Sequence, residues 1–92
     1  MLTLVIDCRG VASEAEFWAR YLEAVQPEDA ERFGRTLNAF WDAVERGGPG
    51  WPGDCVLHFA NTHDLRGLDG GGFLDRFRAV ARNATSLQIS LG

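Results

Sequence analysis

The sequence contains no lysine, so its positive charge comes entirely from nine arginines, which are set against 13 acidic residues. The formal net charge is −4 at pH 7. Most of the acidity lies early: residues 1–31 hold seven acids and two arginines, whereas residues 32–92 are close to neutral. Phosphate binding needs clustered Lys or Arg. The composition therefore argues against nucleic acid as a direct ligand.

Cysteine is also scarce, with only Cys8 and Cys55, each beside an apolar run. Two cysteines do not make the disulfide lattice of a small secreted protein, and we expect buried free thiols. No arginine precedes residue 9, the first apolar stretch ends at Asp7, and no run approaches a membrane span. We therefore expect no secretory signal and no membrane segment, and a cytoplasmic protein.

The length of 92 residues is enough to remove roughly two-thirds of the unfolded surface from water around one core. With 46% hydrophobic and 24% charged residues, the composition is that of a soluble globular protein. We expect one domain spanning residues 1–92.

Three segments have strand patterns. The aliphatic run at residues 2–6 predicts a buried strand, and residues 55–59 predict a second strand on the same grounds. Residues 86–91 alternate strictly between polar and apolar, which predicts a third strand with one covered face. Each is bounded by turn-forming or helix-forming sequence.

The segments between them have helix signals. Ser13 and Glu16 form a capping box for a helix expected to end near Val25, before Pro27. Residues 27–29 predict a short helical turn that Gly34 ends. Thr36 is expected to cap a helix that the stretch 47–53, GGPGWPG, terminates. A glycine-rich loop at 60–72, with one helical turn from Thr62, leads to a last helix.

Apolar residues at helical spacing predict the buried faces of these three helices. They are Phe17, Tyr21, Leu22 and Val25; then Leu37, Phe40, Trp41 and Val44; then Phe73, Leu74, Phe77, Val80 and Ala81. Strands separated by helical crossovers favour an α/β fold with a small parallel three-stranded sheet.

One stretch has a more specific pattern. Residues 33–44 read Phe-Gly-Arg-Thr-Leu-Asn-Ala-Phe-Trp-Asp-Ala-Val. This resembles the signature of the barstar family, aromatic-Gly-x-x-Leu-x-Ala-hydrophobic-Trp-Asp-Ala-hydrophobic. The length and the order of elements agree with that family, so the resemblance covers nearly the whole chain. It implies a barstar-like sheet with strand order 1-2-3.

The resemblance also implies a function: an intracellular inhibitor that plugs the active site of a microbial, guanyl-specific ribonuclease as a monomer in a 1:1 complex. Such a site holds a phosphate in a cup of Arg and His. A carboxylate presented rigidly on the N-terminal half of a helix can occupy that cup and exclude RNA. By matching position, Asp42 is the residue that would do so. No cofactor, metal or catalytic residue is implied.

The family's contact segment falls here on the loop and helix from residue 32 to residue 45. The residues expected to bind the partner are Arg32, Gly34, Arg35, Thr36, Leu37, Asn38, Trp41, Asp42 and Glu45. Trp41 also lies at helical spacing with the apolar residues Leu37 and Val44, so it could pack in the core or bind the partner. Trp51 is likewise open to a place at the interface rim or in the core.

Several positions depart from the family. Arg32 stands where its best-known member has a tyrosine, Arg35 and Asn38 stand where it has acids, and Ala79 replaces an acid of the last helix. Arginines beside Asp42 would repel a strongly basic target, so we expect a ribonuclease that is not strongly basic. The missing acids also favour an alternative: a barstar-like immunity or regulatory protein for a different toxin or protein partner.

Enzyme readings are weaker. Cys55, His58, His63 and Asp64 contain zinc-ligand types, but residues 55 and 58 point to opposite faces of a strand. Residues 70–72, three glycines before a helix, lack the Lys-Ser/Thr of a phosphate loop. Asp42 and Glu45 have no histidine or nucleophile placed near them. We expect a binding protein and no enzyme.

Overall fold

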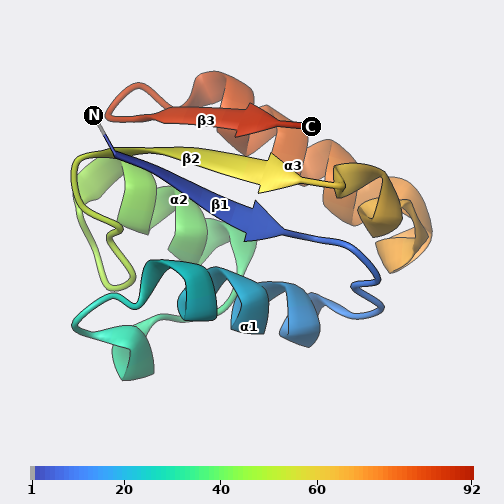
Figure 1. The fold of residues 1–92 in the computed structure, drawn as a ribbon, viewed down its shortest axis with the longest axis horizontal. Coiled ribbons are helices and arrows are strands. Elements are labelled where there is room, and N and C mark those ends of the chain that lie inside the picture. Colours follow the sequence, from blue (N-terminus) through green and yellow to red (C-terminus); the bar gives the residue numbers. More distant parts are fainter. Residues whose placement is uncertain (1) are drawn as a thin grey trace.

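The computed structural model describes residues 2–92 (Figure 1). The elements along the chain are β1 (Leu2–Asp7), α1 (Glu14–Val25), the short 3-10 helix η1 (Ala30–Arg32), α2 (Leu37–Arg46), β2 (Cys55–Ala60), the 3-10 segment η2 (Thr62–Gly71), α3 (Gly72–Asn83) and β3 (Gln88–Leu91). The strands form a parallel sheet in the order β1-β2-β3. The predicted α/β class and strand order are confirmed. Within residues 2–92 no helix is long and apolar enough to cross a membrane.

The helices cover one face of the sheet, so side chains alternate between buried and exposed. Along β2, Cys55, Leu57 and Phe59 are buried, while the residues between them are only half-buried. Residues 2–6 form a strand as predicted, but the expectation that this strand is buried is wrong. β1 lies at the sheet edge, Leu2 and Val5 are 64% and 56% exposed, and only Ile6 is buried. A strand at the edge of a one-sided sheet buries a single stripe of residues.

Aromatic side chains fill the core between sheet and helices. The Phe17 ring lies 4.7 Å from that of Trp18, 5.1 Å from that of Phe73 and 5.3 Å from that of Phe77. The sequence pattern missed Trp18, which is 1% exposed. Its ring lies 5.5 Å from that of Phe33, because the chain after η1 folds back over α1 and widens its buried stripe.

The helix ends show how local sequence sets the elements. Ser13 Oγ accepts from the Glu16 N–H at 3.1 Å, as predicted, whereas Glu16 Oε1 accepts from the Ala12 N–H rather than from that of Ser13. Thr36 Oγ1 accepts from the Ala39 N–H at 3.1 Å and caps α2 as predicted. The helical turn expected to begin at residues 27–29 lies slightly later, at Ala30–Arg32.

The second half of the chain differs from the prediction in two places. The last strand begins at Gln88, two residues later than expected, and its exposure does not alternate: Gln88 is exposed and residues 89–91 are half-buried. Residues 62–71 form a 3-10 segment with a kink at Leu68–Gly70, where a loop with a single turn was expected. On α3, Phe73, Leu74 and Phe77 are buried, as predicted, while Val80 and Ala81 are half-buried.

The residues considered as metal ligands are dispersed. Cys55 is buried and free, as is Cys8. His58, on the open sheet face, lies 2.7 Å (Nδ1 to Oγ) from Ser90 of the neighbouring strand, and His63 pairs with Asp64 at 3.1 Å. Within residues 2–92 no three His, Cys, Asp or Glu side chains are grouped so that they could hold a metal ion.

Candidate functional site

Helix α2 presents one face to the core and one to the outside. Phe40, Ala43 and Val44 are buried. Asn38, Asp42 and Arg46 follow one another at i, i+4 spacing on the other side; Asn38 and Arg46 are exposed and Asp42 is half-buried. Leu37 and Trp41, expected on the buried face, are also half-buried. The outer side of the helix therefore carries a row of three polar side chains, and the middle one, Asp42, is a carboxylate.

Asp42 is the sixth of the ten residues of α2, so the expected place in the N-terminal half of the helix is wrong. The helix begins only at Leu37, after the Thr36 cap. The favourable effect of the helix dipole on a carboxylate is confined to the first turn. Rigidity at Asp42 must therefore come from packing.

That packing comes from Gly48. A Cβ built on Gly48 would lie 2.3 Å from Asp42 Oδ2 and 3.1 Å from its Cγ, so the carboxylate lies directly against the Gly48 backbone. The Gly48 N–H donates to the Asp42 carbonyl at 3.2 Å. No hydrogen bond or ion pair joins the Asp42 carboxylate to any side chain or N–H of residues 2–92. The carboxylate thus packs on the Gly48 backbone through Oδ2 and is engaged by no donor of the described residues.

The loop before α2 is shaped by backbone conformation. Arg35 has φ of +54°, in the left-handed region that residues with a Cβ rarely adopt. Gly34 precedes it, and a Cβ there would lie 3.0 Å from the Ala39 Cβ. Arg32 and Arg35 are both exposed and form no ion pair within residues 2–92. Two arginines without an ion-pair partner among the described residues therefore stand at the start of the predicted contact segment.

The N-terminal end of α2 also borders a groove of about 340 Å³. Thr36, Leu37 and Asn38 form one side of it, and Glu14, Arg76 and Val80 complete it. Arg76 is bound to Asp69 at 3.1 Å. Sequence reasoning missed Arg76, because only the packing of α3 against α2 brings it there; Ala79, singled out by alignment, does not line this groove.

Glu45 has a different setting from the other expected contact residues. Its carboxylate accepts from the Thr85 N–H at 2.8 Å, from the Ser86 N–H at 3.0 Å and from the Thr85 hydroxyl, and the Ser86 hydroxyl donates to the Glu45 carbonyl. These bonds, that of the Thr85 side chain above all, hold the pKa of Glu45 below its usual range. Glu45 thus ties the C-terminal half of α2 to the loop before β3.

The loop after α2 is also firmly held. The hydroxyl of buried Tyr21 donates to the Gly50 carbonyl at 2.8 Å, and Asp29 Oδ1 accepts from the Gly50 N–H at 3.1 Å. Burial raises the pKa of the Tyr21 phenol far above its ordinary value, so this donor stays protonated. Trp51, next along the loop, is half-buried and takes part in none of the aromatic pairs of the core. The glycine-rich stretch is therefore an ordered wall beside Asp42.

The predicted contact residues form one continuous surface segment, and the structure adds the Gly48 backbone and Arg76 beside it. Comparison with known proteins gives one result for the chain as a whole. A protein-family model described as "Barstar (barnase inhibitor)" matches residues 1–90 of the 92. No curated protein matches the sequence.

Proposed function

This chain belongs to the barstar family, and from that membership we propose that it inhibits a microbial, guanyl-specific ribonuclease by placing the Asp42 carboxylate in the enzyme's phosphate site. The observation that carries this proposal is the state of Asp42: half-buried, held against Gly48 and bound to no donor within residues 2–92.

The chemistry follows from what a ribonuclease active site must bind. Cationic side chains hold the phosphate of RNA during cleavage, and a carboxylate of fixed orientation forms charge-assisted hydrogen bonds with the same groups. Because the Gly48 backbone limits where the Asp42 carboxylate can lie, little side-chain freedom is lost on binding. The inhibitor acts by occupation of the site and performs no reaction of its own.

The surrounding surface supports a particular class of target. Arg32 and Arg35 are exposed and unpaired within residues 2–92, and Asn38 is neutral, so the start of the contact segment is positively charged. We propose that the target ribonuclease is not strongly basic. Gly34, Thr36, Leu37 and Trp41 complete the proposed contact surface. Glu45 would act by positioning α2, since its oxygens are already occupied.

The test is inhibition of two guanyl-specific ribonucleases, one basic and one acidic, by the protein and by Asp42→Ala. We expect stoichiometric 1:1 inhibition, stronger for the acidic enzyme, and a loss of about 2–5 kcal/mol of binding free energy in the variant. That range comes from buried charge pairs that include the family's best-known complex, rather than from this structure. Asp75→Ala, an exposed acid on α3, is the matched control and should inhibit normally.

One observation favours a second candidate function. The predicted contact surface has Arg32, Arg35 and Asn38 where the family's best-known member has a tyrosine and two acids, and Ala79 replaces the acid of the last helix. A barstar-like immunity protein for another toxin would need the fold and need not use Asp42 as its anchor. Inhibition of neither ribonuclease, with a folded protein, would support this candidate. In both cases we propose a monomer that acts in the cytoplasm of the cell that makes the toxin.

A further inference from the structure

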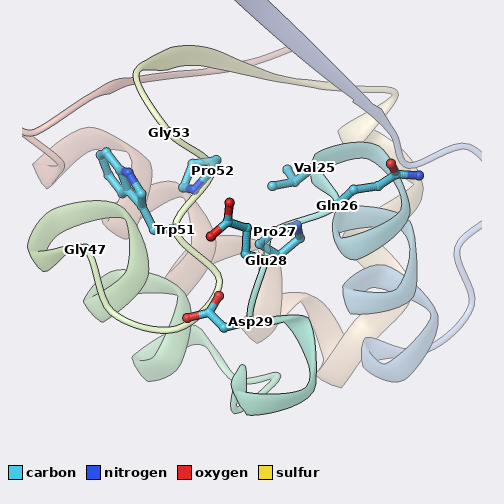
Figure 2. A pocket seen from close by; sticks show the side chains of 9 residues that line it. All are labelled: Val25, Gln26, Pro27, Glu28, Asp29, Gly47, Trp51, Pro52 and Gly53. Atoms are coloured by element: carbon cyan, nitrogen blue, oxygen red, sulfur yellow. The ribbon is translucent and has the colours of Figure 1, made fainter.

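A second recessed surface is lined by the loop that packs against Asp42. It is a groove of about 710 Å³, between residues 25–29, which follow α1, and residues 47–53, which follow α2 (Figure 2). Its lining residues are Val25, Gln26, Pro27, Glu28, Asp29, Gly47, Trp51, Pro52 and Gly53. None of them was predicted as a binding residue, apart from the open question of Trp51.

The two walls of this groove are fixed to each other. Asp29 of one wall accepts from the N–H of Gly50 in the other, and Tyr21 holds the Gly50 carbonyl. Gly50 has φ of +94°, and a Cβ there would lie 2.6 Å from the Phe33 ring. Trp51 N–H donates to the Gly48 carbonyl at 3.1 Å and closes a turn. The groove is therefore preformed, and an occupant need not order it.

The lining combines negative charge with flat apolar surface. Glu28 is exposed, and its carboxylate forms no hydrogen bond or ion pair within residues 2–92. Figure 2 shows that carboxylate between Pro52 of the loop and Pro27 of the opposite wall, with the Trp51 ring at one end. Glu28 and Asp29 both carry negative charge, and no arginine or histidine lines the groove. Arg46, just before Gly47, is exposed and is not part of the lining.

We propose that this groove binds an arginine side chain of the protein partner, as a second recognition point beside Asp42. A guanidinium group is planar, pairs with a carboxylate through two N–H donors and stacks on aromatic and proline surfaces. Glu28 supplies the carboxylate, and Trp51, Pro27 and Pro52 supply the flat surfaces. A lysine ammonium matches the charge but not the planar surfaces.

The position of the groove suits a single partner. Gly47 lines the groove and Gly48 contacts the Asp42 carboxylate, so adjacent residues of one loop belong to both surfaces. A protein interface of ordinary size, roughly 800 Å² on each side, covers two such neighbouring points. That the partner is a ribonuclease rests on the proposed function; the preference of the groove for arginine does not.

The first experiment therefore uses a probe that does not depend on the partner. The ¹⁵N-labelled protein is titrated with acetyl-Gly-Arg-Gly-amide and with the same peptide carrying citrulline or lysine. We expect the arginine peptide to shift the amide signals of Glu28, Gly47 and Gly53 and the Trp51 indole N–H signal. The shifts of these signals caused by the citrulline and lysine peptides should be smaller by a factor of about three or more. Equal shifts with all three peptides would overturn the proposal.

Paired variants then locate the charge. Glu28→Gln removes the carboxylate from the groove, whereas Glu31→Gln removes the same charge from η1, outside it. Only Glu28→Gln should abolish the response to arginine. Against a ribonuclease that the wild-type protein inhibits, Glu28→Gln should weaken binding about tenfold and Glu31→Gln less than about twofold. Equal effects of the two variants would refute the arginine site. If Asp42→Ala inhibits the ribonuclease as well as the wild-type protein does, while the arginine peptide still shifts the groove signals, only the ribonuclease assignment is refuted.

Discussion

The orientation of Asp42 can be tested without removing its charge, by the substitution Gly48→Ala. The added Cβ would lie 2.3 Å from Asp42 Oδ2, and ordinary contact begins near 3.4 Å, so the carboxylate must retreat by about 1 Å. The next backbone atom, the Asp42 carbonyl oxygen, is already at 3.5 Å and need not move. Gly48 has no left-handed φ, so alanine fits its backbone conformation. The displacement therefore falls on the side chain that the proposed function depends on.

The magnitude follows from what such a shift does to charge-assisted hydrogen bonds. A displacement of about 1 Å takes a carboxylate out of bonding distance of donors placed to receive it, and a hydrogen bond to a charged group is worth about 1.5–3 kcal/mol. We expect inhibition of the target ribonuclease to weaken roughly 10- to 100-fold, less than for Asp42→Ala. The melting temperature should change by no more than about 5 °C, since alanine at a compatible position offsets part of the strain.

The control is Gly67→Ala, which makes the same chemical change in η2 at a position where a Cβ meets nothing within 4 Å. It should leave inhibition at the wild-type level. Inhibition constants come from ribonuclease titration and melting temperatures from circular dichroism. Wild-type inhibition by a folded Gly48→Ala protein would mean that the partner does not depend on the orientation of this carboxylate, and the reasoning would fail.

Three further predictions concern the scaffold. Tyr21→Phe leaves the buried Gly50 carbonyl without its donor at a cost of about 1–3 kcal/mol. Calorimetry should therefore show a melting temperature roughly 4–24 °C lower, and an unchanged value would contradict the anchoring role. The pKa of Glu45 is lowered below its ordinary value of 4.5, so its contribution to stability is present above that pH and is lost as pH falls through the lowered folded pKa. Glu45→Gln should flatten this part of the plot of unfolding free energy against pH, measured by urea titration. A plot identical to that of the wild-type protein would refute the role of the Glu45 hydrogen bonds. Burial raises the pKa of Cys8 to about 11 and also raises that of Cys55, so neither thiol should react readily with Ellman's reagent at pH 8 before unfolding, and prompt reaction of either in the native protein would contradict its burial.

The fold was predictable because its signals are local. The caps at Ser13 and Thr36 and the apolar runs of the strands lie in adjacent residues, and the crossover order dictates a parallel sheet. The predictions that failed concern the packing of elements against one another, which decides which side chains are buried. An aliphatic run has the same pattern whether one or both faces are covered, so the exposure of Val5 could not be inferred. The burial of Trp18 depends on Phe33, which folds back over α1 from 15 residues away.

The candidate site likewise has features that a local sequence pattern predicts and features that depend on contacts between separate segments. The motif at residues 33–44 predicts a contact segment with Asp42 as its anchor, and both stay predictions. It could not indicate that Glu45 is bound by Thr85, 40 residues later, or that Gly48 orients Asp42 from outside the helix. Contacts between distant segments have no local signature, because the residues they need, a threonine, a glycine and a glutamate, are common in any surface loop.

The anchoring of the 47–53 loop has a consequence for how the surface of this protein can change over evolutionary time. The side-chain bonds that hold this loop end on its main chain: on the N–H and the carbonyl of Gly50 and, from the Cys55 thiol at 3.9 Å, on the carbonyl of Pro52. The neighbouring side chains at positions 49, 51 and 52 make no hydrogen bond that holds the loop, yet two of them line the groove. The main-chain groups that hold the loop in place are therefore different from the side chains that a partner would contact. Under the proposed function, these positions can vary as the partner's surface changes, while the scaffold stays constant.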